Sequence, residues 1–197
     1  MTPDINPFVL FFASIFTSNI LLSNFLGMCS FISVSKDIKS SNGLGMAVTF
    51  VMTITTALNW IVYKYLLIPF NIEYLKYIVF IIVIAAVVQI LEMIIERVSM
   101  NLYMALGIFL PLITVNCAIL GVALFMQLRN YNLIQSVFFG FGSGLGWWLA
   151  IMALAAIRKK VDKAPVPAAL KGPGITLIII GFMAMAFIGF SGMLSVQ

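Results

Sequence analysis

The stretches Ser23-Asn24-Phe25-Leu26-Gly27-Met28-Cys29-Ser30 and Pro111-Leu112-Ile113-Thr114-Val115-Asn116-Cys117 each place an Asn, a helix breaker and a Cys inside a long apolar run. The breakers differ in kind, since Gly27 loosens a helix and Pro111 removes a backbone donor from it. Non-helical backbone survives at membrane depth only where buried protein or a cavity satisfies its polar groups. We therefore expect these stretches to interrupt two membrane helices around a functional centre.

The composition excludes an ordinary soluble domain. Of the 197 residues, 63% are apolar and 9% are charged, and the mean hydropathy is +1.16, whereas soluble domains carry about 25% charged residues. The net charge of +5 indicates no nucleic-acid partner, because basic residues in a membrane protein mark its cytoplasmic loops. Histidine is absent, which leaves Cys, Asp and Glu for metal or proton chemistry. We predict an integral protein of the lipid bilayer.

Six apolar stretches reach the roughly 20 residues that a membrane helix needs. They are residues 7–34, 43–63, 74–95, 102–128, 133–157 and 174–194. The predicted fold is all-α, because the strands of a membrane barrel would alternate apolar and polar residues.

The six stretches divide into two halves of three. The chain 1–197 then forms one transmembrane domain with repeat halves of about 1–98 and 99–197. Three crossings per half invert the second half relative to the first. Interrupted segments at corresponding positions, here the first and fourth helices, indicate a site at the repeat interface.

Lysines and arginines are divided unequally between the two sides of this arrangement. One side holds three: Lys64, Lys76 and Arg129. The other side holds eight: Lys36, Lys39, Arg97, Arg158, Lys159, Lys160, Lys163 and Lys171. The positive-inside rule places the larger group in the cytoplasm and both termini outside it. We expect Arg158 and the two lysines after it to serve only as a topology anchor.

Glu92 and Gln89 are candidates for an ion pathway. They are three positions apart in the third stretch and therefore share one helix face. An intramembrane carboxylate is a functional candidate, and its oxygens suit a hard cation such as Na⁺ or a proton relay. In the alternative interpretation, Glu92 extends to the cytoplasmic headgroups or pairs with a nearby cation.

Four glycines open the fifth stretch: Gly140, Gly142, Gly144 and Gly146. They contain two overlapping small-xxx-small registers, which predict close packing between helices. Trp147 and Trp148 follow them and are typical of an aromatic belt at a membrane surface.

Cys29 and Cys117 are the only cysteines and allow two interpretations. A Cys in a membrane helix is commonly a small, inert apolar residue. A thiolate can also bind metal, and iron–sulfur clusters want four thiolates, typically closely spaced in the chain. These two are 88 positions apart (117 − 29), so the chain cannot hold a cluster alone. If both bind metal, they meet across the repeat axis and another subunit supplies two more thiolates.

Several motifs resemble the NqrDE/RnfAE family of membrane subunits, over nearly the whole chain. They are Phe25-Leu26-Gly27-Met28-Cys29-Ser30-Phe31, Val34-Ser35-Lys36, Gln89-Ile90-Leu91-Glu92-Met93, residues 106–118 and Phe187-Ile188-Gly189-Phe190-Ser191-Gly192. The block 106–118 is highly specific. Within the family, Gly27-Met28-Cys29 and residues 140–147 are most similar to the branch found in Na⁺-translocating NADH:quinone reductases. The alternative is the RnfA branch of ion-translocating ferredoxin:NAD⁺ oxidoreductases.

The resemblance implies a six-subunit translocase of the bacterial inner membrane that passes electrons from NADH to ubiquinone and moves Na⁺ outward. It implies a [2Fe–2S] cluster shared with a homologous, oppositely oriented subunit (NqrD- or RnfE-like), with Cys29 and Cys117 as the ligands from this chain. NADH, flavins and quinone would bind to other subunits, so this chain would have no catalytic activity of its own. We expect electron relay at the cysteines to be coupled to cation movement near Glu92.

Two other classes of protein fit parts of the pattern. An inverted-repeat secondary transporter explains the interrupted helices and Glu92, but it gives the cysteines no role. A structural membrane scaffold explains the glycines and the low charge, and it predicts a colourless protein without iron.

Overall fold

The computed structural model describes residues 6–98, 110–165, 167 and 172–189 of the chain. The regular elements in these residues are all helical, with no strand among them. In chain order they are α1 (Pro7–Ile15), α2 (Ile20–Asn24), α3 (Met28–Val34), α4 (Ile38–Val62), the π-helical turn η1 (Tyr63–Leu67), the 3-10 turn η2 (Glu73–Leu75), α5 (Lys76–Val98), α7 (Leu110–Thr114), α8 (Cys117–Leu128), α9 (Leu133–Val161) and α10 (Pro173–Ile188).

Within the described residues, four helical stretches are long and apolar enough to cross a membrane: Ile38–Leu67, Glu73–Ile94, Pro111–Leu128 and Leu133–Val161. The helix α10 is also apolar but has only 16 residues. The prediction of an all-α, multi-pass membrane protein is confirmed. The number of six spans stays a prediction, because residues 102–109 and 190–194 of the expected spans lie outside the described residues.

The first expected span, residues 7–34, is three short helices rather than one interrupted helix. The chain breaks after Ile15 and again after Asn24, so there is one break more than the sequence predicted. The additional break is stabilised by Asn19, whose side chain accepts hydrogen bonds from the backbone N–H groups of Leu21 and Leu22 (3.1 and 3.4 Å). An Asn in this position caps a helix and satisfies its free donors. The cap allows the chain to turn without leaving those N–H groups unpaired.

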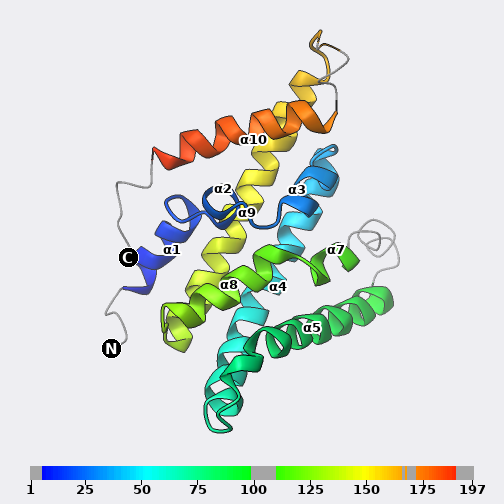
Figure 1. Cartoon of the computed structure of the whole chain (residues 1–197). Helices are drawn as coiled ribbons and strands as arrows, with labels where there is room; N and C mark the ends of the chain where they lie inside the picture. Colours follow the sequence, from blue (N-terminus) through cyan, green and yellow to red (C-terminus); the bar gives the residue numbers. More distant parts are fainter. Residues whose placement is uncertain (1–5, 99–109, 166, 168–171, 190–197) are drawn as a thin grey trace.

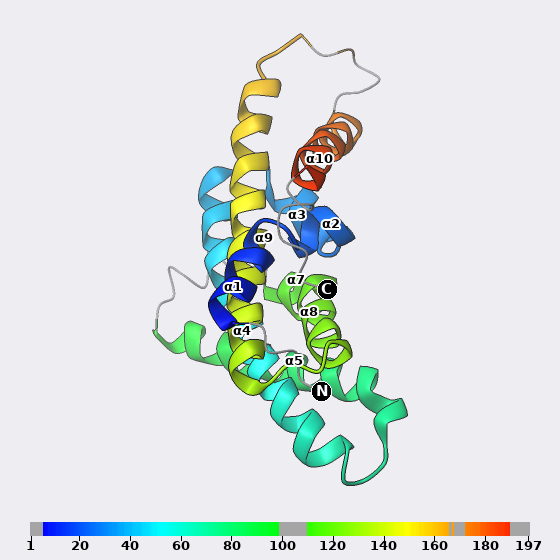
Figure 2. The same ribbon diagram turned by 90° about the vertical axis from the view of Figure 1, so that its left-hand side faces the viewer.

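The helices α4 and α9 form the central pair and pack along much of their lengths (Figures 1 and 2). The glycine run allows α9 to accept a second neighbour as well. Gly144 faces α4, and a β-carbon there would lie 2.8 Å from the Cα of Thr49. Gly146 faces α1, and a β-carbon there would lie 2.9 Å from the carbonyl oxygen of Ile15. The predicted close packing is confirmed, and each register contacts a different helix.

The remaining helices pack reciprocally between the two halves. The helix α1 packs on α9, whereas α8 packs on α4. The helix α10 contacts α2, whereas α5 contacts α7 and α8. Each half therefore places a broken segment against the long middle helix of the other half. Each half also places its last helix against the other's broken segment. In Figure 1, α10 and α5 accordingly lie at opposite ends of the molecule.

The start of α4 is fixed by a side-chain cap at the turn that leads from α3. Asp37 accepts hydrogen bonds from the backbone N–H of Ser40 (3.1 Å) and from its hydroxyl (2.9 Å). The backbone hydrogen bond, followed by that from the hydroxyl, lowers the pKa of the Asp37 carboxyl below its usual value. A charged acceptor at this position suits the positive end of the helix dipole.

We predict that Gly144→Ala lowers the free energy of unfolding by about 1–3 kcal/mol, because the new methyl group overpacks the α4–α9 contact. The measurement is denaturant unfolding of the purified chain in detergent micelles. Gly181→Ala in α10 is the matched control, since a β-carbon there meets no described atom within 4 Å. Equal stability of the Gly144→Ala variant and the wild type would contradict the packing of α4 on α9.

Candidate functional site

Each cysteine lies in the first turn of a helical segment that follows a chain break. Cys29 is the second residue of α3, and Cys117 is the first residue of α8. The first of these breaks uses two left-handed residues, Phe25 with φ of 54° and Gly27 with φ of 86°. A glycine adopts this conformation without strain. The break near Gly27 is therefore where the sequence predicted it.

The break before Cys117 differs from the prediction. Pro111 is the second residue of α7, where a proline is tolerated because the first turn of a helix has no use for its N–H group. The interruption comes instead at Val115 and Asn116, between α7 and α8. The side chain of Asn116 accepts a hydrogen bond from the backbone N–H of Ala118 (3.0 Å) and so caps α8. The capping Asn, and not the proline, marks the break.

The two broken stretches meet in the fold. The backbone N–H of Gly27 donates a hydrogen bond to the Sγ of Cys117, with 2.9 Å between N and S. These residues are 90 positions apart in the chain. Both cysteines are free thiols with exposed side chains, and Cys29 follows Gly27 by two residues. The arrangement brings the two cysteine stretches together at a surface that another chain can reach.

Two buried donors without partners lie close to this contact. Trp147 Nε1 and Asn116 Nδ2 are buried, and neither has a hydrogen-bond partner among the described residues. A β-carbon on Gly27 would lie 2.7 Å from Trp147 Nε1 and 3.2 Å from Asn116 Oδ1. A buried donor without an acceptor costs about 1–3 kcal/mol. The site is therefore rich in N–H groups, which suits an acceptor with negative charge.

Trp147 is a residue that the sequence interpretation misplaced. It was expected in an aromatic belt, but its side chain is 0% exposed and packs edge-on against Phe31 of α3, with ring centroids 6.5 Å apart. The glycine at position 27 leaves room for its indole. No pattern in the sequence distinguishes Trp147 from Trp148, which is half-buried and donates to Asn42 (3.2 Å).

An apolar cavity of about 380 Å³ opens beside Cys117, between α5 and the α7–α8 break. The lining residues are Ile81, Ile84, Ala85, Thr114, Val115, Asn116, Cys117 and Leu120. Among the described residues, no group of three or more His, Cys, Asp or Glu is placed to hold a metal ion. Any metal at the cysteines would therefore need ligands from elsewhere.

Glu92 and Gln89 lie on α5, and neither lines this cavity. Glu92 follows Ala85 by seven positions, which is about 10 Å along the helix axis. Glu92 is half-buried and Gln89 is exposed. Within the described parts of the chain, no salt bridge to Glu92 is formed. The structure thus brings the two cysteine stretches together but leaves the acidic candidate as a separate feature.

A family model described as "Rnf-Nqr subunit, membrane protein" matches residues 8–194. The chain belongs to the Rnf-Nqr family. The resemblance expected from the motifs is confirmed, and the match covers both broken stretches and both cysteines.

Similar proteins are named as the E subunit of a Na⁺-translocating NADH-quinone reductase. The one from Proteus mirabilis is 51% identical over 189 residues, covering 93% of this chain and 96% of its own length. The one from Chlamydia trachomatis serovar L2 is 50% identical over 195 residues, with coverage of 93% and 80%. The one from Chlamydia caviae is 47% identical over 200 residues, with coverage of 95% and 76%. These relatives of the Rnf-Nqr chain are subunits of an oxidoreductase complex.

Arg158 has a structural role in this Rnf-Nqr chain that sequence reasoning missed. It was expected to be only a topology anchor, but its side chain is 9% exposed. Its Nη1 donates to the carbonyl of Ile32 (2.9 Å) and to the hydroxyl of Ser35 (2.7 Å). Arg158 thereby binds the C-terminal end of α3, where a positive charge suits the helix dipole. It fixes, from α9, the short helix that carries Cys29.

We predict that Arg158→Gln lowers the free energy of unfolding by about 2 kcal/mol, since the shorter side chain leaves buried hydrogen-bond partners unpaired. Hydrogen–deuterium exchange of α3 should rise in the same variant. Lys159→Gln is the matched control, because Lys159 is exposed and surface substitutions change stability by about 0.5 kcal/mol or less. Unchanged exchange in α3 of the Arg158→Gln variant would contradict this role.

Proposed function

We propose that this chain is the E subunit of a Na⁺-translocating NADH-quinone reductase and supplies Cys29 and Cys117 as half of the ligands of a [2Fe–2S] cluster. The observation that carries the proposal is the 2.9 Å contact between the N–H of Gly27 and the Sγ of Cys117. It joins two thiol-bearing stretches that the chain separates by 90 positions.

The residues present fit half of such a group. A [2Fe–2S] cluster needs four thiolates, and this chain offers two exposed ones. A homologous membrane subunit of opposite orientation is the proposed source of the other two. When bound, the cluster would supply one-electron storage and transfer between donors and acceptors on other subunits, where NADH, flavins and quinone would bind.

The residues of this chain would hold negative charge at the sulfur atoms. The N–H of Gly27 donates to Cys117, and hydrogen bonds to cluster sulfurs are one means of setting a reduction potential. The unpaired donor of Trp147 lies next to Gly27 and extends the same positive environment, and Asn116, which precedes Cys117, has a second buried donor without a partner among the described residues. Buried Ile113 and Ala118 keep water from the inner side of the site.

The reciprocal packing supports an inverted repeat with halves of about 1–98 and 99–197. The pairing of α1 with α9 matches that of α8 with α4, and the contact of α10 with α2 matches that of α5 with the α7–α8 segment. A pseudo-twofold axis between the halves would place the cysteine stretches where a second subunit of this fold could face them. The proposed location is the bacterial inner membrane, with both termini outside the cytoplasm because most lysines and arginines lie on the other side.

The names of the relatives favour NADH-quinone reductase over ferredoxin:NAD⁺ oxidoreductase, since all three are called the E subunit of the former. A secondary transporter or a scaffold would leave the exposed thiols and the unpaired donors without a use. We propose a cation pathway near Glu92 of α5, because a half-buried carboxylate within a membrane helix is a functional candidate.

We predict that Cys29→Ala and Cys117→Ala, each made in the complex with its partner subunits, lose the iron of the shared cluster. The measurements are iron content and the electron paramagnetic resonance signal of the reduced complex. Met28→Leu is the control, because this neighbouring substitution conserves volume and should keep both. Full iron content in either Cys variant would sink the proposal. A secondary transporter predicts instead that the wild-type complex holds no iron at the cysteines and that Cys29→Ala has no effect.

We predict that Glu92→Gln weakens the apparent Na⁺ affinity of the complex roughly tenfold, corresponding to about 1.4 kcal/mol. The measurement is the Na⁺ dependence of NADH-quinone reductase activity and of Na⁺ uptake into vesicles. Glu96→Gln, at an exposed position one turn later on α5, is the control and should be unaffected. Wild-type Na⁺ dependence in Glu92→Gln would remove Glu92 from the pathway.

A further inference from the structure

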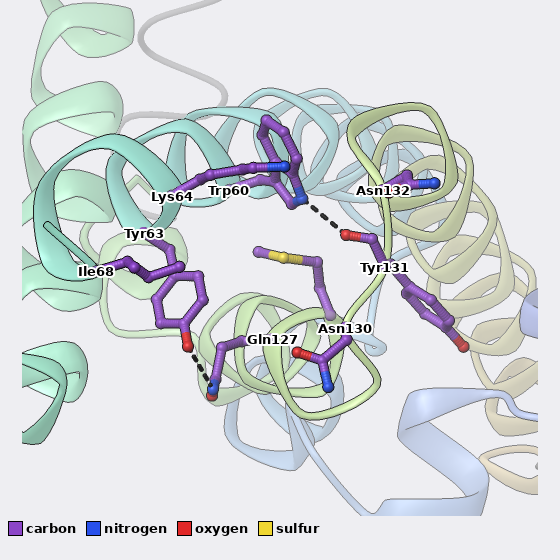
Figure 3. Close-up of a pocket in the computed structure, with 9 residues that line it drawn as sticks. Trp60, Tyr63, Lys64, Ile68, Gln127, Asn130, Tyr131 and Asn132 are labelled. Carbon is purple, nitrogen blue, oxygen red and sulfur yellow. Dashed lines mark hydrogen bonds between the residues drawn. The ribbon is translucent and has the colours of Figure 1, made fainter. Parts of the chain in front are cut away.

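A second cavity, of about 180 Å³, lies at the opposite end of α4 from its Asp37 cap and is not part of the cysteine site. It is lined by Trp60, Tyr63, Lys64, Ile68, Met126, Gln127, Asn130, Tyr131 and Asn132. Figure 3 shows the space between α4 on one side and the α8–α9 turn on the other, with the ring of Tyr131 pointing away from it. The cavity thus lies at an end of the helix bundle, and nothing in the proposed electron relay uses it.

Local backbone geometry builds the wall on the α4 side. The helix widens into the π-helical turn Tyr63–Leu67, in which the N–H of Ile68 bonds to the carbonyl of Tyr63 (3.2 Å). Such turns are rare and are found frequently at functional sites. The wall is tied to the opposite side by Trp60 Nε1, which donates to the carbonyl of Tyr131 (2.7 Å). These bonds give the cavity a fixed shape.

Two positive charges of this end of the molecule lie at or beside the cavity. Lys64 lines it directly, with its Nζ 4.9 Å from the ring centroid of Trp60. Lys76 donates to the side-chain oxygen of the lining residue Gln127 (3.1 Å). Arg129 donates to the hydroxyl of Tyr131 (3.1 Å). These are the three basic residues of the smaller charge group in the sequence, and two of them, Lys64 and Lys76, lie at the cavity or bond to its lining.

The nearby connection between α4 and α5 offers little negative charge to balance them. Its one carboxylate, Glu73, is exposed, and no salt bridge to it is formed within the described parts of the chain. The amides of Asn130 and Asn132 add further hydrogen-bond donors to the lining. The cavity is therefore suited to an anion.

The surroundings indicate which kind of anion. Large aromatic side chains stand exposed around the α4–α5 connection: Tyr65, Phe70, Tyr74 and Tyr77, at 72, 67, 76 and 52%. Tyrosines concentrate at the headgroup level of membranes. Exposed Leu66 and Ile68 add apolar surface at and next to the cavity. A ligand with a phosphate at headgroup depth and a hydrocarbon chain matches both features.

We propose that this cavity binds the phosphate group of an anionic phospholipid. Lys64 and Lys76 supply the charge, the amides of Asn130 and Asn132 supply hydrogen bonds, and the acyl chains lie along the outer face of η1. This inference does not depend on the identity of the ligands at Cys29 and Cys117.

The test measures the thermal stability of the full chain in detergent while short-chain phosphatidylglycerol is added. Short-chain phosphatidylcholine and inorganic phosphate are titrated in parallel. Phosphatidylglycerol is expected to raise the melting temperature at concentrations where the other two have little effect. An equal rise with inorganic phosphate, or with phosphatidylcholine, would overturn the assignment to an anionic lipid.

Substitutions of the basic residues show where phosphatidylglycerol binds. Lys64→Gln should raise the concentration of phosphatidylglycerol for half-maximal stabilisation roughly fivefold, and K64Q/K76Q roughly twenty-five-fold, on the usual contribution of a basic residue near a lipid surface. K64R/K76R should restore most of the affinity. The matched control K159Q/K160Q removes the same charge from two exposed residues at the other end of α9 and should leave the affinity unchanged.

The control also separates a specific site from general attraction between charges. A loss of affinity in K159Q/K160Q equal to that in K64Q/K76Q would show unspecific attraction and overturn the proposal. The side chain of Lys64 contacts the ring of Trp60 and forms no hydrogen bond or salt bridge with the residues that the structure describes. The single variant Lys64→Gln therefore remains a fair test if the double variant does not fold.

Discussion

The constraint on which the rest of the structure depends is the need to satisfy polar backbone wherever a helix breaks inside a membrane. Lipid offers no hydrogen bonds, so every break must find its partners within the protein. This chain meets that need with side chains and with the other half of the molecule. Asn19 and Asn116 cap the segments that follow their breaks, and the free N–H of Gly27 reaches the sulfur of Cys117. The same bonds that satisfy the breaks also assemble the site.

A helix break of this kind costs free energy. We therefore expect the local structure that it creates to serve a function. The N–H groups of Gly27 and Trp147 lie close together next to exposed thiols, and the buried amide of Asn116 lies beside them. Two of these donors have no partner within the described part of the chain. A subunit whose site is completed by a neighbouring subunit would leave such donors unpaired. The helix α5 likewise has much uncovered surface, since only 17% of its apolar window is buried within the described chain.

The sequence predicted some of this and could not have predicted the rest. Membrane class, helical content and the close packing of the glycine run follow from composition and spacing, because both are local properties. The break at Gly27 was predictable for the same reason. The break at Asn116 was wrongly assigned to Pro111, although an Asn before an apolar run is a recognisable cap.

The roles of Arg158 and Trp147 depend on which distant residues they contact. Arg158 contacts Ile32 and Ser35, and Trp147 lies against Gly27. No local pattern separates them from their neighbours Lys159 and Trp148.

The two glycine registers of α9 have a mechanical consequence. Because Gly144 is pressed against α4 while Gly146 is pressed against α1, a rotation of α9 about its own axis would drive a larger side chain into one neighbour or the other. The three helices therefore form one closely packed unit. Helices α5 and α10, and the broken segments that they contact, lie outside this unit. A large displacement of helices is therefore sterically easier there.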